Sequence, residues 1–171
     1  ELHNLDGWSL QTITGIADKQ GIIYLGDRSY LRLRFAYERL SFFYPLAGKS
    51  LKIGKHTIRF GIPQIEILQP AKKLRSRLVV IKGYQEAESF LKAAQRQLDK
   101  LGINGTAIIP KNIDGEPKRK TIKIKRFTVV GFGLEVINLN NEDSLALQRY
   151  GIGGKHKMGC GVFVPVKEEL S

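Results

Sequence analysis

The sequence of 171 residues predicts an α+β protein, and two observations predict it. Residues 9–77 show short runs with the two-residue alternation of strands, broken by turn residues, and no long stretch with helical spacing. Residues 78–166 mix such runs with two segments of helical spacing, in the order β-α-β-β-α-β. The first half is therefore expected to be mostly β, and the second to carry the helices.

The clearest strand of the first half is predicted over residues 28–37. Its odd positions from Leu31 to Tyr37 are apolar or aromatic, and its even positions from Arg28 to Arg34 are basic apart from Tyr30. One face is thus expected to be buried and the other to bind a ligand. Further along, residues 38–45 predict one helical turn, residues 52–60 a hairpin turning near Gly54, and residues 63–68 another strand.

The second half contains a well-defined helix, predicted over residues 86–101 with Gly102 as its C-terminal cap. A second helix is expected from Asn141, as N-cap, to about Tyr150. Strands are predicted at residues 78–81, 106–109 and 161–166, with one or two across 121–138. This order is that of the ferredoxin-like unit, an antiparallel sheet with two helices on one face. Since no low-complexity linker separates the halves, they are expected to pack closely.

Charge points to a polyanionic partner. The chain has 28 Lys and Arg against 16 Asp and Glu, a formal net charge of +12. Residues 71–171 carry most of the excess, with 19 basic and 10 acidic side chains. The single cysteine, Cys160, excludes an internal disulfide and fits a reducing compartment, and no apolar run is long enough to span a bilayer. A cytoplasmic protein is expected, with no membrane partner.

The segment from Gly151 to Gly161, here called the glycine loop, is the most informative motif. Its glycines are expected to leave backbone amides uncovered while its lysines supply charge, so that the loop could touch phosphate; an ordinary flexible connection is the alternative. The loop residues predicted to bind are Gly151, Gly153, Gly154, Lys155, His156, Lys157, Gly159 and Gly161.

Familiar nucleotide motifs are absent from this sequence. Residues 47–50 resemble the end of a P-loop, but Phe43 stands where its first glycine belongs, and His156 interrupts a G-x-G-x-x-G pattern.

A dense basic tract at residues 118–126 adds to the charge of the second half. A solvated edge strand, kept from aggregating by its charge, is the alternative interpretation. Together with basic residues elsewhere the tract suffices to track a nucleic-acid backbone, and structured RNA is favoured. The further residues predicted to bind RNA are Arg28, Arg32, Arg34, Arg75, Arg77, Arg119, Lys123 and Lys125.

Only three histidines, His3, His56 and His156, could carry protons near neutral pH. They are far apart in sequence with no carboxylate or thiol at ligand spacing, so no metal centre and no cofactor are predicted. His56 is expected to be exposed, and His156 to donate to phosphate. His3 could lie on a fraying terminus or act as a general base.

At this point several motifs resemble a known family. The stretch from Gly151 to Pro165 resembles the signature loop of the CRISPR-associated repeat-processing endoribonucleases of the RAMP superfamily, and most closely those of type I-MYXAN and cyanobacterial type I-D systems. Residues 45–49, 61–64, 80–85 and 130–133 carry the same resemblance, which covers nearly the whole chain.

The resemblance implies tandem ferredoxin-like folds, residues 1–75 and 76–171, that bind a hairpin of precursor CRISPR RNA. It implies cleavage at the 3′ base of the hairpin by attack of a 2′-hydroxyl, without a metal, followed by retention of the product. It also implies association with other Cas subunits of a type I surveillance complex. His3, as part of a Leu-His pair, is the position that matches the family's general base.

The resemblance further implies that the first fold is short of its opening β-α unit, because members of the subgroup carry a strand and a helix ahead of this point. Two alternatives to the nuclease stay open. One is a non-catalytic RAMP subunit that binds or caps CRISPR RNA, and the other is a generic basic RNA-binding module.

Overall fold

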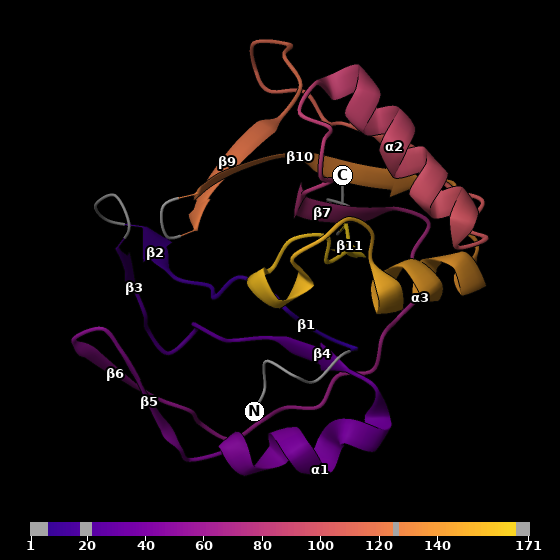
Figure 1. The fold of residues 1–171 in the computed structure, drawn as a ribbon. Helices are drawn as coiled ribbons and strands as arrows, with labels where there is room; N and C mark the ends of the chain where they lie inside the picture. The colour runs from indigo at the N-terminus through magenta and orange to yellow at the C-terminus, as the bar shows by residue number, and fades with distance from the viewer. Residues whose placement is uncertain (1–6, 18–21, 125–126, 167–171) are drawn as a thin grey trace.

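The computed structural model describes residues 7–17, 22–124 and 127–166 (Figure 1). Its second half contains one antiparallel sheet and two helices, as predicted; the sheet has five strands, and its first strand ends at Val79 instead of covering the predicted residues 78–81. Four strands follow the order β11-β7-β10-β8, and β9 also pairs with β10, alongside β8. This is the strand order of a ferredoxin-like unit with one strand added. The elements are β7 (Leu74–Val79), α2 (Ala87–Lys100), β8 (Thr106–Ile108), β9 (Arg119–Ile124), β10 (Phe127–Ile137), α3 (Asn141–Tyr150) and β11 (Val164–Pro165).

The two helices form at the segments that their apolar spacing and capping residues predict. In α2 the predicted stripe faces the sheet, with Phe90, Ala94 and Leu98 fully buried. Gly102 adopts φ +71° after the helix, and the Ile103 amide donates to the Leu98 carbonyl, which closes a Schellman motif. The cap of α3 is Asn140, one residue earlier than predicted: its Oδ1 accepts from the Asp143 amide at 2.8 Å.

The first half is built of three small two-stranded sheets. They pair β1 with β4, β2 with β3 and β5 with β6, and a short helix, α1, follows β4 between two 3-10 turns. The elements are β1 (Trp8–Leu10), β2 (Ile16–Ala17), β3 (Ile23–Tyr24), β4 (Leu33–Phe35), η2 (Tyr37–Arg39), α1 (Leu40–Phe43), η3 (Tyr44–Leu46), β5 (Ser50–Ile53) and β6 (His56–Arg59). The hairpin and the helical turn were both predicted.

Two strand predictions in this half are wrong. The strand expected over residues 28–37 is reduced to Leu33–Phe35. Before β4 the chain keeps single hydrogen bonds, from the Gln11 amide to the Arg32 carbonyl and from the Thr14 amide to the Tyr30 carbonyl, without a continuous ladder. Residues 63–68 form no strand: among the described residues their backbone groups have no hydrogen-bonded backbone partner, and Ile65 and Ile67 are 68% and 82% exposed. Apolar alternation alone therefore does not make a strand where no neighbouring strand is present.

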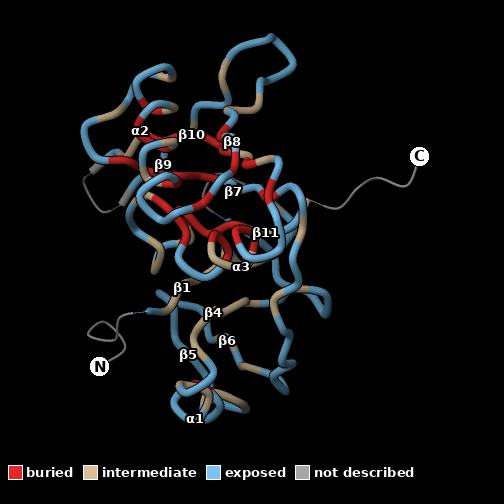
Figure 2. Tube along the Cα trace, turned by 90° about the vertical axis from the view of Figure 1, so that its right-hand side faces the viewer, coloured by how far each residue is buried: buried red, intermediate tan, exposed pale blue. Residues whose placement is uncertain are grey.

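Burial is concentrated in the second half (Figure 2). The main core lies between the sheet and its two helices, with Phe132 against Phe90 at 4.8 Å between ring centroids. In the described part of residues 7–73 only Phe43 is buried, stacked on Phe35 with ring centroids 4.3 Å apart. The second half thus holds most of the free energy of hydrophobic burial, and the first half packs onto it.

Candidate nucleic-acid interface

The sheet of the second half has one face under the helices. Its other face, here called the open face, is exposed along part of β7 and covered near Leu78 by Cys160 of the glycine loop. Along β7 the burial alternates, with Leu74 and Ser76 buried towards the helices and Arg75 and Arg77 exposed on the opposite side. A bulge places two residues of β7, Arg77 and Leu78, opposite Gly133 of β10. The extra residue is in β7, so β10 keeps its alternation, with Phe132 on the helix face and Gly133 on the open face. The side on which each basic residue lies follows from this register.

Four cations gather on the open face, two on β7 and two at the start of β9. Lys120 pairs with Gly131, an open-face position, and Lys118 packs against Gly133, beside the backbone of Arg77. We call these four residues, Arg75, Arg77, Lys118 and Lys120, the basic strand face. The carboxylate that lies among them, Glu135, opposite Arg75, is paired with Lys73 at 2.7 Å. The four cations are therefore not neutralised by that acid.

The electrostatics of Lys120 show how closely these cations are packed. Partial burial lowers the pKa of Lys120 from its usual value, and the positive charges of Arg77 and Lys118 lower it further. Mutual repulsion of this kind is relieved when an anion binds between the cations. The arrangement is suited to a ligand with closely spaced negative charges, such as a phosphate backbone.

Two other residues predicted to bind RNA lie on the opposite side of the same sheet. Arg119 pairs with Phe132 and Lys123 with Thr128, both helix-face positions. Both cations are exposed because they lie on β9, and the hairpin of β9 and β10 extends beyond the helices in Figure 1. The structure therefore brings Arg75 and Arg77 together and separates them from Arg119 and Lys123. Lys125 lies outside the described residues.

The glycine loop differs from the expectation in one important respect, because most of its glycine amides are already used. The Gly161 amide donates to the Leu78 carbonyl at 2.7 Å, Gly154 to Val80 at 2.9 Å and Gly153 to Oε1 of Gln97 at 2.7 Å. Gly151 and Gly159 donate to Leu147 and His156. The prediction of uncovered amides is wrong: the loop runs along the edge of β7 and uses its glycines for packing.

Close packing explains why glycine is needed here. A Cβ on Gly161 would overlap the carbonyl oxygen of Ile152, and one on Gly151 would overlap that of Gly161. The ring of His156 fills the space above these two glycines, with Nε2 3.4 Å from the Ile152 carbonyl oxygen. His156 is half-buried within the loop, whereas Lys155 is exposed. RNA binding by the loop stays a prediction. Of its predicted side chains Lys155, His156 and Lys157, Lys155 is the exposed one.

The loop also joins the two halves of the molecule. Its 3-10 turn, η4 (His156–Met158), packs against β1, and Lys157 Nζ lies 5.9 Å from the centre of the Trp8 ring. On its other side Cys160 is buried with Leu78 and Val80. Because Gly161 donates to the carbonyl of Leu78, the residue after Arg77, the loop borders the basic strand face.

Arg34, predicted to bind RNA, is occupied by the protein itself. Its Nη1 donates to the Gln148 carbonyl, at the end of α3, and to the Phe163 carbonyl at 2.9 Å. Burial, reinforced by the charge of Arg32, lowers the pKa of Arg34 to about 10, so the guanidinium stays charged at neutral pH. This position gives Arg34 a structural role, linking β4 to the second half.

The remaining predicted residues lie apart from the basic strand face. Arg32 pairs with Glu66 at 3.1 Å and lies over the Tyr30 ring at 4.8 Å, and Arg28 is exposed in a turn. His56 is exposed on β6. His3 lies outside the described residues, so its role as a general base stays a prediction.

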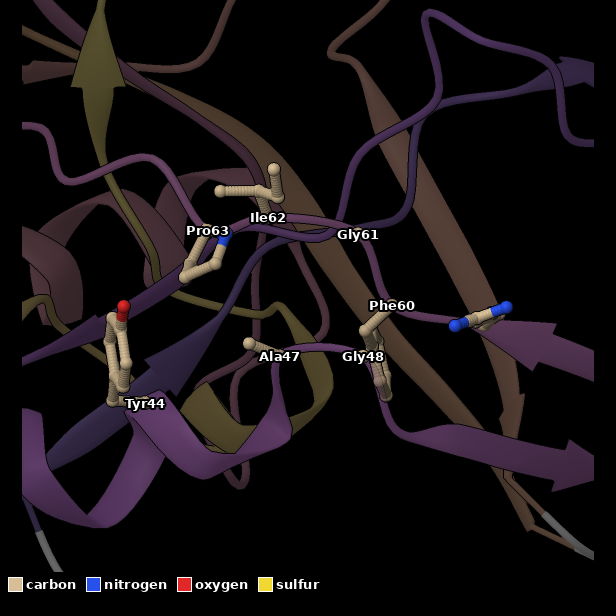
Figure 3. Close-up of a pocket in the computed structure, with 8 residues that line it drawn as sticks. Tyr44, Ala47, Gly48, Phe60, Gly61, Ile62 and Pro63 are labelled. Carbon is tan, nitrogen blue, oxygen red and sulfur yellow. The ribbon is translucent and has the colours of Figure 1, made fainter.

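A pocket in the first half lies between two of the sequence motifs, residues 45–49 and 61–64. Tyr44, Ala47, Gly48 and residues 59–63 line a cavity of about 310 Å³, shown in Figure 3. The Gly48 amide donates to the Phe60 carbonyl at 3.1 Å, so residues 47–50 form a turn into β5. A phosphate loop is therefore not built here, as the sequence indicated.

Two other features are absent from the described part of the chain. No cluster of three or more His, Cys, Asp or Glu side chains there could hold a metal ion. The helices that the structure describes include none with the length and apolarity to cross a bilayer.

Two comparisons with known proteins show the family to which the chain belongs. The family model described as Cas6, Cas6 Crispr, matches residues 1–168. The CRISPR-associated endonuclease Cas6 of Myxococcus xanthus (strain DK1622) is 33% identical over 164 residues, covering 96% of this chain and 68% of that protein.

Two solved structures are also similar in part. One is CRISPR endoribonuclease Cse3 bound to a 19-nucleotide RNA, 16% identical with a TM-score of 0.35, covering 66% of this chain and 65% of that chain. The other is a CRISPR-associated protein from Thermus thermophilus, 13% identical with a TM-score of 0.37, covering 92% of this chain and 76% of that one. The family model and the Myxococcus relative, which span nearly all of the chain, decide the assignment: this chain belongs to the Cas6 family of CRISPR-associated endonucleases.

Proposed function

We propose that this chain binds the hairpin that a CRISPR repeat forms in precursor RNA and cleaves it at the 3′ base of the stem. The basic strand face is the observation that supports it best. Arg75, Arg77, Lys118 and Lys120 lie on one exposed strand surface, close enough that Arg77 and Lys118 lower the pKa of Lys120. An RNA stem offers phosphates and 2′-hydroxyls across its shallow groove, which suits a strand surface of this kind.

The proposed reaction needs no metal ion. The 2′-oxygen of the nucleotide before the cut loses its proton to a base and attacks the adjacent phosphorus. The bond from phosphorus to the 5′-oxygen breaks, and that oxygen takes up a proton. The products are a 2′,3′-cyclic phosphate and a 5′-hydroxyl. His3 is proposed as the base, and Lys155 stabilises the charge that develops on the phosphate.

Release of the product is proposed to be slow, so that the chain keeps the mature RNA and carries it to other Cas subunits of a type I complex. The neighbouring cations of the basic strand face support this step, because they hold the stem equally well before and after the cut at its base. A non-catalytic subunit that caps CRISPR RNA would bind the same hairpin and leave it whole.

The test is a cleavage assay on the repeat RNA of the locus that encodes the protein, labelled at its 5′ end and incubated in EDTA. One cut at the 3′ base of the stem is expected. A matched RNA with 2′-deoxyribose at the scissile nucleotide should bind equally and stay intact. Normal cleavage of the deoxy RNA would rule out the proposed nucleophile. Binding without cleavage of either RNA would favour the capping subunit.

A further inference from the structure

A groove lies at the end of the sheet where β7 separates from β10, on the far side of the glycine loop from Arg77. Its volume is about 610 Å³, within the ~300–1,000 Å³ range of pockets that take small ligands. Three segments and one helix residue form it: residues 80–83 with Gln85 after β7, residues 128–130 of β10, residues 153–155 of the glycine loop, and Gln97 of α2. It is separate from the basic strand face.

The lining of the groove combines cations with hydrogen-bonding groups. Lys82 and Lys155, both exposed, come from two different segments, and none of the described residues that line the groove is acidic. Lys123 pairs with Thr128 across β9 and β10 and so adds a third cation beside it. The site is therefore complementary to a negatively charged group.

The groove also offers groups that could read a base. Gln85 is exposed at its rim, and Gln97 uses Oε1 to accept from Gly153, which leaves its Nε2 without a partner among the described residues. Within the described strands, residues 128–130 pair with β9 on one side only, so their other backbone edge faces no strand. Val129 and Val130 add apolar surface, half-buried, for the face of a base.

The groove is also close to the surface that holds the stem. Val80, at its inner end, is three residues beyond Arg77, which corresponds to about 10 Å along an extended strand. The exposed backbone at Gly154 leaves the passage open, since a Cβ there would have no neighbour nearer than 4.0 Å. A chain leaving a stem on the basic strand face could thus cross the glycine loop into the groove.

We propose that this groove binds one unpaired ribonucleotide of the single strand that flanks the hairpin, its phosphate between Lys82 and Lys155 and its base against residues 128–130. This inference rests on the proposed function and adds a second point of contact to it. Recognition of unpaired bases by hydrogen bonds and apolar contact is the usual way in which proteins read RNA sequence. The groove would therefore select the nucleotide beside the stem.

The experiment uses photocrosslinking, because it locates the contact directly. Two probes carry 4-thiouridine: a five-residue single-stranded RNA, and the repeat hairpin with the label in its single-stranded flank. After irradiation, crosslinked peptides are identified by mass spectrometry. Both probes are expected to crosslink within residues 80–85, 128–130 or 153–155.

A double variant tests whether two side chains of the groove contribute to RNA binding. Lys82→Ala with Gln85→Ala should lower the crosslinking yield of the five-residue RNA about tenfold, since a charge-assisted and a neutral hydrogen bond are both lost. Lys52→Ala with Gln64→Ala is the matched control, because both residues are exposed in the first half. The control variant should crosslink like the wild type.

The outcomes separate this inference from the proposed function. Crosslinks from both probes outside the groove, or no loss of crosslinking yield in the double variant, overturn the proposed binding of a ribonucleotide in the groove, even if the hairpin is cleaved. Crosslinks in the groove without cleavage of the hairpin support nucleotide binding there and count against the proposed nuclease activity.

Discussion

Single glycines in the glycine loop have a physical role that can be tested by substitution. Gly161 has φ +67°, and a Cβ there would overlap the Ile152 carbonyl oxygen, whereas Gly154 has room and no positive φ. Gly161→Ala is expected to lower the free energy of unfolding by at least about 2 kcal/mol, from backbone strain and overpacking. Gly154→Ala, the control, should stay within about 0.5 kcal/mol of the wild type. Urea unfolding followed by circular dichroism measures both, and equal stabilities would show that the loop is not packed as described.

The thiol of Cys160 reports on the same loop. Its side chain is 1% exposed, and burial raises the pKa of the thiol, an effect that the charge of Lys155 partly offsets. Since the thiolate is the reactive form, Cys160 in the folded protein should react with a disulfide reagent at pH 8 at least about 100-fold more slowly than in urea. Stopped-flow absorbance measures the two rates. Equal rates would indicate that the glycine loop opens freely.

At the scale of single residues, His3 is the proposed general base of the cleavage reaction. A general base contributes about 10²- to 10⁴-fold to a rate, so His3→Ala should slow single-turnover cleavage of the repeat RNA by that factor. Binding of the hairpin, measured by filter retention, should be unchanged, and His56→Ala is the control because His56 is exposed on β6. If the cleavage rate of His3→Ala matches the wild type, the base must be sought elsewhere.

Elements of the second half could be predicted from the sequence, because local signals there agree with the packing. The stripe of α2, its Gly102 cap and the strand alternation of residues 121–138 correspond to the observed helix and hairpin. In the first half, residues 63–68 show the alternation without the strand, since pairing depends on a neighbour that local sequence does not reveal.

The candidate site was predictable only in part. The sequence predicted correctly that Arg119 and Lys123 lie on the same face of one strand, and it also showed the basic tract. The grouping of Lys118 and Lys120 with Arg75 and Arg77 depends on the register of β9, β10 and β7, with a bulge opposite Gly133, which no single segment encodes. The paired amides of the glycine loop likewise depend on its contact with the edge of β7.

Contact between elements of the two halves depends on Arg34. It joins β4 to the carbonyl end of α3, where a cation also interacts favourably with the helix dipole. Arg34→Met should lower the free energy of unfolding by about 2 kcal/mol, because two carbonyls lose a charged donor. Thermal unfolding monitored by calorimetry measures the loss, with the exposed Arg28→Met as the control, expected within about 0.5 kcal/mol. An Arg34→Met protein as stable as that control would show that this contact does not hold the halves together.

At the scale of the whole molecule, charge and family point the same way. A net charge of +12 is concentrated in the second half, and the predicted family is confirmed by a match over residues 1–168. The basic strand face, the glycine loop and the groove follow one another along the same sheet, so a folded RNA could contact all three. Binding of such an RNA should weaken as salt rises, because each neutralised phosphate releases counterions.

The dependence of RNA binding on salt tests the basic strand face most directly. The logarithm of the association constant for the repeat hairpin is plotted against the logarithm of salt concentration for three proteins. Relative to the wild type, Arg77→Ala with Lys118→Ala should reduce the magnitude of the slope by about 1.4 to 1.8, since each phosphate contact contributes about 0.7 to 0.9. Lys92→Ala with Lys100→Ala, which removes the same charge from the exposed side of α2, should leave the slope unchanged. Equal slopes for the two double variants would contradict the assignment of this face to RNA.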